Sequence, residues 1–268
     1  MNSEIRPDEL LRLLPPVRRA RGYHLYGAGG ERFLDLWQED GRGVLGAKGF
    51  ALGTLAKDEI DRGILAPLGD RSAETRLSGE ILSILPEYKA VRIFQSEAQA
   101  CARLAAAGGL GAQVHEPARI RPFSEFERGY VRGTAGSPAL FILPCPAFLS
   151  PAALLFSSEK EASAFVSDLL APVQLKAGYK ALREFRAYRA KFSEEIWKST
   201  DRYTADLFDR SGPLLYPRGH CAEPLCYAEL FRSALAAGIL LSPSPERPSI
   251  IPGEFSPGEL KKLTKLAI

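Results

Sequence analysis

Residues 76–107 read RLSGEILSILPEYKAVRIFQSEAQACARLAAA, and the rest of the chain is organised around them. Apolar side chains recur at helical spacing in the first part, at Leu77, Ile81 and Leu85, which predicts an amphipathic helix. The proline that follows ends this helix because it has no backbone N–H. Residues 90–94 (AVRIF) predict a buried strand. A polar turn then opens an Ala-rich helix, and the free amides at a helix N-terminus are suited to holding a phosphate group.

The order of helix, strand and Ser-Glu-Ala at the start of an Ala-rich helix resembles the fold-type I enzymes that use pyridoxal 5′-phosphate (PLP). It is most similar to the class III aminotransferases, whose phosphate-binding turn typically reads S-G-T-E-A. Ser96 stands where that family has its phosphate-binding Thr or Ser. Gln95 replaces a glycine that allows close approach of the backbone to the phosphate. By this resemblance, the cofactor-binding candidates are Gln95, Ser96 and Glu97.

The stretch 22–49, GYHLYGAGGERFLDLWQEDGRGVLGAKG, carries the resemblance further. It predicts a β-hairpin and is similar to the family's opening pattern G-x-x-L-Y-D-x-D-G-x-x-Y-L-D, followed by G-x-x-x-L-G-H. Ala47 stands in place of the usual histidine. The alternative is a generic hairpin with a Gly-rich loop. The matching residues are Leu25, Tyr26, Gly30, Phe33, Leu34, Asp35, Leu45 and Gly46.

Residues 227–267 resemble the family's last segment, in which a helix, the pattern G-V/I-x-L-x-P-S, a strand and a final helix close the small domain. The matching residues are Tyr227, Phe231, Leu235, Gly238, Leu241, Pro243 and Ser244. Upstream of them, apolar residues recur at spacings of three, four and seven over residues 176–210, which predicts one long helix. By the resemblance, this helix links the large and small domains.

These observations predict an α/β protein with a fold-type I PLP-transferase-like architecture. Residues 139–143 (ALFIL) and 152–156 (AALLF) are continuous apolar runs that fit central strands covered on both faces. We expect residues 50–175 to form a reduced large domain, with a mostly parallel sheet flanked by helices and a short strand near residues 112–115. The N-terminal helix and hairpin segment, residues 1–49, is expected to pack with the small domain. Residues 176–268 should then hold the long linking helix and the small C-terminal α/β domain.

The resemblance also implies two functional residues that the chain does not offer. Fold-type I enzymes need a lysine for the Schiff base and an acidic residue for the pyridinium nitrogen. Both should fall in or beside residues 133–158, which contain no Asp, Glu or Lys. Cys145 lies where the lysine-bearing strand would end. It is interpreted as a small buried apolar residue, with a nucleophile as the alternative.

Three lysines follow this span, but their positions are expected to be exposed. They are Lys160, Lys176 and Lys180. A Schiff-base lysine needs a lowered pKa, which requires burial or a nearby cation. We therefore assign no catalytic residue. The leading hypothesis is a shortened, catalytically degenerate relative of the class III aminotransferases with a binding or assembly role. The alternative is an active PLP-dependent aminotransferase that uses an unconventionally placed lysine.

Further expectations concern the cofactor, partners and location. Without the lysine, PLP is not expected to be covalently bound, and a small anionic ligand is expected at the turn of residues 95–97. A homodimer is expected because family members build each active site from two subunits. The 268 residues carry a net charge of only +3, and the basic run VRRAR at residues 17–21 fits a solvated face, so no nucleic acid partner is expected.

No membrane partner is expected either, because prolines interrupt the uncharged stretch at residues 133–158, and we expect no signal peptide. The cysteines form no CxxC motif and predict reduced thiols and a cytoplasmic location. A metal site at His220, Cys221 and Cys226 would lack a fourth ligand, so no metal is expected. The cysteines are Cys101, Cys145, Cys221 and Cys226.

Overall fold

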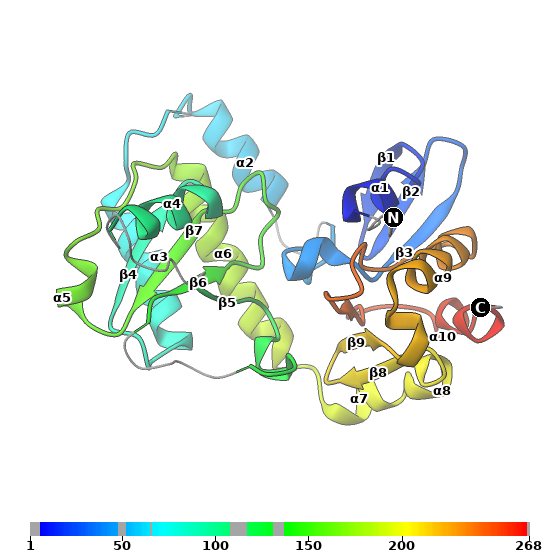
Figure 1. Cartoon of the computed structure of the whole chain (residues 1–268). Coiled ribbons are helices and arrows are strands. Elements are labelled where there is room, and N and C mark those ends of the chain that lie inside the picture. The colour runs from blue at the N-terminus through cyan, green and yellow to red at the C-terminus, as the bar shows by residue number, and fades with distance from the viewer. Residues whose placement is uncertain (1–5, 48–51, 65, 108–116, 131–136, 267–268) are drawn as a thin grey trace. The chain divides into compact units, whose positions relative to one another are not determined.

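In the computed structural model, the chain forms two compact units, and each is described here by itself (Figure 1). Unit 1 comprises residues 1–49, 125–128 and 188–268, and unit 2 comprises residues 50–124 and 129–187. The structure describes residues 6–47, 52–64, 66–107, 117–130 and 137–266. The short strand expected near residues 112–115 lies outside the described residues.

Unit 2 contains a four-stranded sheet in the order β4-β7-β6-β5. Its strands are β4 (Ala90–Phe94), β7 (Ala152–Phe156), β6 (Ala139–Ile142) and β5 (Ala118–Ile120). β5 and β6 run parallel, but β7 runs antiparallel to both β6 and β4. Three of the four described strands, β4, β5 and β6, therefore run in the same direction, as expected for a mostly parallel sheet, and β7 is the exception. The reason is that β6 and β7 are joined by only nine residues, 143–151, whereas a parallel crossover needs a dozen or more.

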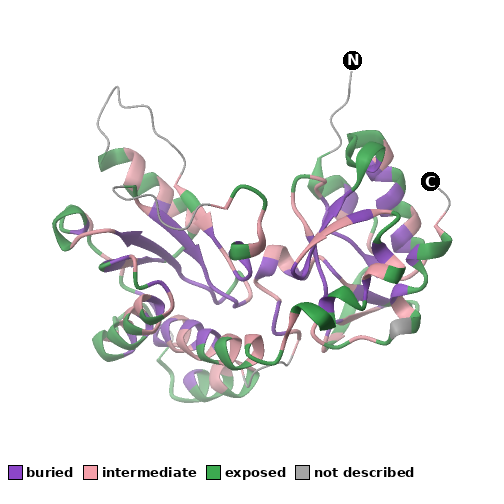
Figure 2. Cartoon of the chain, turned by 90° about the horizontal axis from the view of Figure 1, so that it is seen from below, coloured by how far each residue is buried: buried purple, intermediate pink, exposed green. Residues whose placement is uncertain are grey.

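The core of unit 2 is built from the residues that the apolar runs predicted. Every residue of β6 and β7 is buried, and β4 is buried except at Arg92 (Figure 2). One face of the sheet packs against helix α4 (Glu97–Ala107) through Ala100, and against the short helix α5 (Glu159–Ala162) through Ala162. Helix α3 (Arg71–Ile84) buries Leu77 and Ile81, as their spacing predicted. Helix α2 (Leu52–Asp61) also belongs to this unit.

Unit 1 holds two small sheets. The first has the order β1-β2-β3-β10, with strands β1 (Val17–Arg21), β2 (His24–Gly27), β3 (Arg32–Asp35) and β10 (Ile239–Leu240). The expected hairpin is confirmed, because β2 and β3 pair antiparallel with Leu25 opposite Phe33. The second sheet has the order β11-β9-β8, with strands β11 (Ser249–Ile250), β9 (Leu214–Pro217) and β8 (Phe208–Ser211).

The helices of unit 1 surround these sheets. They are α1 (Pro7–Leu11), α7 (Glu194–Lys198), α8 (Asp201–Thr204), α9 (Pro224–Ala236) and α10 (Pro257–Leu260), with short 3-10 turns between them. α9 buries an apolar face that includes Phe231, and the hydroxyl of Tyr227 donates a hydrogen bond to the carbonyl of Ser242 at 2.6 Å. In chain order, α9, β10, β11 and α10 follow one another, as the resemblance of the C-terminal segment implied.

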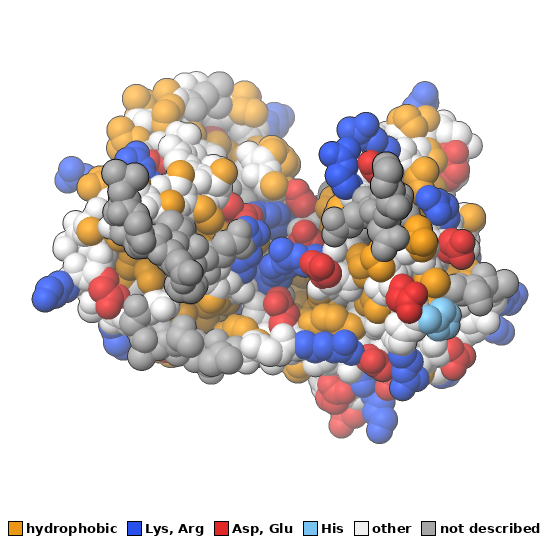
Figure 3. Space-filling view, viewed as in Figure 1, with side chains coloured by type: hydrophobic (Ala, Val, Ile, Leu, Met, Phe, Trp, Pro, Cys, Tyr) orange, Lys and Arg blue, Asp and Glu red, His pale blue; other side chains and the backbone are white. Residues whose placement is uncertain are grey.

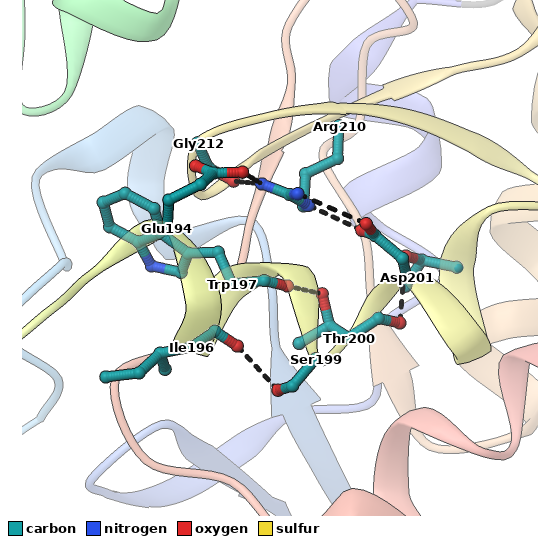
Figure 4. A network of polar contacts seen from close by, with 9 residues as sticks. Glu194, Ile196, Trp197, Ser199, Thr200, Asp201, Arg210 and Gly212 are labelled. Atoms are coloured by element: carbon teal, nitrogen blue, oxygen red, sulfur yellow. Dashed lines mark hydrogen bonds and ion pairs between the residues drawn. The ribbon is translucent and has the colours of Figure 1, made fainter.

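The single long helix expected over residues 176–210 is wrong. Helix α6 spans Pro172–Arg189, and the chain then forms the two short helices α7 and α8. Serine and threonine side chains compete with the helix backbone in this stretch, since the hydroxyls of Ser199 and Thr200 donate to the carbonyls of Ile196 and Trp197 (Figure 4). The apolar periodicity continues through residues 192–204, but hydroxyl-bearing residues interrupt the helical backbone.

Candidate functional site

Strands β4, β5 and β6 all end at the same edge of the unit 2 sheet. Phe94 and Ile142, the last residues of β4 and β6, both lie opposite Ala152 in β7. β5 runs parallel to β6 and therefore ends at this edge as well. Ligands of open α/β sheets bind outside the carboxyl ends of the strands. The segments that follow these three strand ends form the candidate site. They are residues 95–97, 121–124 and 143–151.

The three residues predicted to bind a cofactor are together at the start of α4, but each already has a partner within the chain. The Ser96 hydroxyl oxygen accepts a hydrogen bond from the backbone N–H of Gln99 at 3.2 Å, which makes it the N-cap of the helix. Glu97 forms a salt bridge with Arg119, with 3.4 Å between Oε2 and Nη1. The backbone N–H of Gln95 donates to the Asp168 carboxylate at 3.1 Å. Ligand binding at these residues stays a prediction.

Asp168, which no sequence pattern indicated, is a second acidic residue at this turn. Its side chain is only 12 % exposed, and Oδ1 lies 3.7 Å from Nη2 of Arg103 in α4. Its backbone N–H donates to the carbonyl of Ile93 in β4 at 2.8 Å. Asp168 lies 73 residues after Gln95 in an irregular segment, so no periodicity or local motif indicates that the two residues meet.

The ends of β5 and β6 carry neither of the residues that PLP chemistry needs. Arg121 follows β5, and its N–H donates to the Ser124 hydroxyl at 2.7 Å. Leu143 and Cys145 follow β6, and both are fully buried. Within residues 121–124 and 143–151, all of which are described, there is no lysine, aspartate or glutamate. Cys145 has the buried position expected for it.

The three lysines considered as replacements lie in different environments in unit 2. Lys160 is exposed in the short helix α5. Lys176 forms a salt bridge with the buried Glu59 of α2, with 2.8 Å between Nζ and Oε1. Lys180 is partly buried in the middle of α6. Each lysine is therefore exposed, paired or part of a structural helix.

Comparison with solved structures identifies the fold. An omega-transaminase from Sphaerobacter thermophilus matches with a TM-score of 0.65 at 11% identity, covering 94% of this chain and 89% of that chain. N-acetylornithine aminotransferase from Stenotrophomonas maltophilia matches with a TM-score of 0.61 at 15% identity, covering 95% of each chain. A thermostable omega transaminase mutant from Pseudomonas jessenii matches with a TM-score of 0.64 at 10% identity, covering 99% of this chain and 94% of that chain.

The chain has the fold of the PLP-dependent aminotransferases. The α/β fold class inferred from the turn, the hairpin and the C-terminal segment is thereby confirmed.

Two sequence relatives span nearly the whole chain. An uncharacterized protein from Borreliella burgdorferi is 27% identical over 261 residues, covering 94% of this chain and 90% of that protein. An uncharacterized protein from Treponema pallidum is 25% identical over 286 residues, covering 91% of each. No model of a known protein family matches the sequence. The comparisons thus define the fold and leave the chemistry to be argued from the residues.

Unit 1 contains a pocket of about 590 Å³ between the end of α9 and strand β3. Apolar side chains such as Phe33 and Leu235 line it, together with the cations Arg32, Arg232 and Lys262. Arg32 is paired with Glu259 at 2.8 Å. The one acidic residue in the lining, Glu31, accepts a hydrogen bond from the N–H of Gly29. The pocket therefore combines an apolar wall with an excess of positive charge, which suits a small ligand with an anionic group.

His220, Cys221 and Cys226 are the side chains that come nearest to a metal-binding motif in the sequence. Cys221 Sγ lies 3.8 Å from Nε2 of His220, and burial raises the pKa of the Cys221 thiol. Across the described ranges, no group of three or more His, Cys, Asp or Glu side chains is placed to hold a metal ion.

Within the same ranges, no helix has the length and apolar character needed to span a bilayer. On the face seen in Figure 3, basic and acidic side chains are interspersed.

Proposed function

We propose that this chain is a catalytically degenerate protein of aminotransferase fold, which acts by binding or assembly and not by transamination. The observation that carries the proposal is the composition of the strand ends. Arg121 follows β5, and Leu143 and Cys145 follow β6, at the edge where PLP chemistry requires a lysine and an acid. A guanidinium group cannot pair with a pyridinium nitrogen, since both are positively charged.

The same residues do not fit covalently bound PLP. The cofactor would need a lysine within reach of its aldehyde, and the described strand-end segments hold none. It would also need donors for its phosphate, and the Gln95 N–H of the expected turn already donates to the Asp168 carboxylate. The described sheet of unit 2 has four strands, which is consistent with the proposal of a reduced large domain that has lost its chemistry.

The test is to add PLP to the full-length protein, record the visible absorbance, reduce with borohydride and measure the intact mass. We expect no absorbance band of a lysine Schiff base and no stoichiometric adduct. As a control for nonspecific labelling, the same treatment is applied to the protein unfolded in urea, in which every lysine is accessible. One PLP on one lysine of the native protein, located by peptide mapping, would overturn the proposal and support the alternative of an active aminotransferase with an unconventionally placed lysine.

Assembly as a homodimer is the second part of the proposal. Three exposed apolar side chains of unit 2, here called the apolar patch, support it: Leu68 is 72%, Val166 81% and Leu169 64% exposed. Leu169 packs against the backbone next to Leu68, because a Cβ built on Gly69 would lie 3.0 Å from Cδ2 of Leu169. Exposed apolar patches mark interaction sites, and two-fold dimers are the commonest assemblies.

A cytoplasmic location is also proposed, since all four cysteines are free thiols.

Binding of a small anionic ligand is the third part. The turn at residues 95–97 was the expected place, but its amide donor is engaged with Asp168. The unit 1 pocket supports a second place, because Arg232 and Lys262 line it and neither forms a salt bridge with a described residue. An aliphatic carboxylate of moderate length matches both its cations and its apolar wall.

A further inference from the structure

The segment Phe165–Leu169 runs along the outer side of β4. β4 is an edge strand of the four described strands, so its outer backbone groups need partners. The backbone N–H of Ile93 donates to the Ser167 hydroxyl oxygen at 3.0 Å, and the Ile93 carbonyl accepts from the Asp168 N–H at 2.8 Å. Arg92 Nε donates to the Phe165 carbonyl at 3.0 Å. The segment thus covers the strand edge and is held in register with it.

This register places the Asp168 carboxylate at the turn that opens α4. Oδ2 accepts the hydrogen bond from the Gln95 N–H, and Oδ1 faces Arg103. The Gln95 side chain closes the arrangement from the other side, with Nε2 donating to the Leu169 carbonyl at 3.4 Å. The carboxylate is therefore fixed by the backbone before it and by contacts on both of its oxygens.

The Asp168 carboxylate is therefore itself the negatively charged group bound at this turn. The Gln95 amide lies just before the N-cap Ser96, beside a helix N-terminus that stabilises negative charge, and a carboxylate that accepts from this amide makes a charge-assisted hydrogen bond. A phosphate brought to the same amide would lie within a few ångström of Asp168, and like charges at that distance repel strongly in a partly buried site. We infer that Asp168 determines the specificity of this turn: it supplies the anion from within the chain and excludes the phosphate group of PLP and of other phosphate esters.

This inference goes beyond the proposed function, because it concerns phosphate exclusion and not the missing lysine. The two are separated by using probes that cannot form a Schiff base. Inorganic phosphate and pyridoxine 5′-phosphate, which lacks the aldehyde, are titrated against the full-length protein while its thermal stability is followed. A ligand of the native state raises stability by RT ln(1 + [L]/Kd), so the titration gives Kd.

The decisive variant is Asp168→Asn, which removes the charge and keeps an oxygen that can accept from the Gln95 N–H. The matched control is Asp70→Asn in the same unit. Asp70 is also an aspartate at a helix start, and its Oδ1 accepts from the Ala73 N–H at 3.0 Å, but it caps α3. We expect the Asp168→Asn protein to bind both probes at least tenfold more tightly than the wild type, and the Asp70→Asn protein to behave as the wild type.

A second substitution locates the site. Ser96→Ala in the Asp168→Asn background should abolish the gain, because Ser96 belongs to the same turn. Asp168→Ser, which also removes the charge and keeps a short acceptor, serves if the asparagine variant does not fold. Circular dichroism establishes folding of each protein. Equal affinity of the wild type and the charge-removed variant, no binding by either charge-removed variant, or an equal gain in Asp70→Asn would each overturn the inference.

Discussion

Arg210 in β8 and Asp201 in α8 form a two-point salt bridge, with 2.6 Å between Nε and Oδ1 and 3.2 Å between Nη2 and Oδ2. Arg210 also contacts Glu194 of α7 at 2.8 Å and donates to the Gly212 carbonyl at 2.9 Å (Figure 4). Its side chain is only 11 % exposed. One guanidinium group thus joins both short helices of residues 194–204 to the strand that follows them.

Arg210→Gln is expected to lower the free energy of unfolding by about 2 kcal/mol, since a planar donor fork is lost and two carboxylates lose their partner. Arg210→Lys should show a smaller loss, because a lysine keeps the charge but cannot make the two-point contact. Urea unfolding measures both. The control is Arg202→Gln. Arg202 is an exposed arginine in α8, the helix that also holds Asp201, and its substitution is expected to change the free energy of unfolding by less than about 0.5 kcal/mol. An Arg210→Gln protein as stable as this control would contradict the assigned role.

Asp35 predicts a pH dependence of stability. Its Oδ1 accepts from the N–H groups of both Trp37 and Gln38, at 3.0 and 2.8 Å. The next residues are held in the left-handed region, with φ of 48° at Gln38, 48° at Glu39 and 54° at Asp40. Burial raises the pKa of Asp35 to about 6 from 3.8, although the two hydrogen bonds oppose the shift.

Because the folded-state pKa is raised, the contribution of Asp35 to stability is present below about pH 4 and lost as the pH rises through about 6. Asp35→Asn keeps an oxygen for both hydrogen bonds and has no proton to lose. Relative to this variant, the wild type should lose up to about 3 kcal/mol between pH 4 and pH 7, the equivalent of about two pKa units. Urea unfolding across this range measures the difference.

Asp35→Ala serves as the second variant. It loses both acceptor contacts, so it is expected to be less stable than Asp35→Asn at every pH. A difference in the free energy of unfolding between wild type and Asp35→Asn that stays constant from pH 4 to pH 7 would show that the pKa of the Asp35 carboxyl group is not raised by folding.

Local signals were sufficient to predict much of unit 2. The spacing of Leu77 and Ile81 identified α3, the apolar run identified β4, and the polar turn after the strand identified the start of α4. The direction of β7 was not predicted, because an apolar run does not encode whether its neighbour is parallel. The break between α7 and α8 was missed because apolar periodicity continues through a stretch where Ser199 and Thr200 bond to the backbone.

The candidate site was predicted only in its local part. The turn at Gln95 and Ser96 follows from the sequence, but its partner Asp168 arrives through pairing along the edge of β4. That pairing depends on tertiary structure and leaves no motif in the chain. The absence of lysine, aspartate and glutamate from residues 133–158, in contrast, could be read directly from the sequence.

The unit 1 pocket predicts binding of a short aliphatic carboxylate, for which hexanoate is the probe. Its carboxylate would pair with Arg232 and Lys262, and its chain would cover Phe33 and Leu235. Isothermal titration calorimetry should show saturable binding to the wild type and at least tenfold weaker binding to Arg232→Gln/Lys262→Gln, through loss of both cations. Lys261→Gln/Lys265→Gln removes equal charge at two exposed residues outside the pocket lining and should leave the affinity unchanged. Unchanged affinity in the first variant would place the ligand elsewhere.

The last prediction concerns the apolar patch of Leu68, Val166 and Leu169. Covering these exposed side chains with a second copy of the patch removes apolar area from water, at about 25 cal/mol per Å². We expect light scattering of the wild type at micromolar concentration to give twice the chain mass of 29.3 kDa. Leu68→Glu/Leu169→Glu should shift the mass to that of one chain, because paired patches would then bury like charges. Leu225→Glu, at a site in unit 1 that is 66% exposed, is the matched control and should stay dimeric. A wild-type mass near 29.3 kDa would exclude the homodimer, and a dimer unaffected by the two glutamates would place its interface outside the patch.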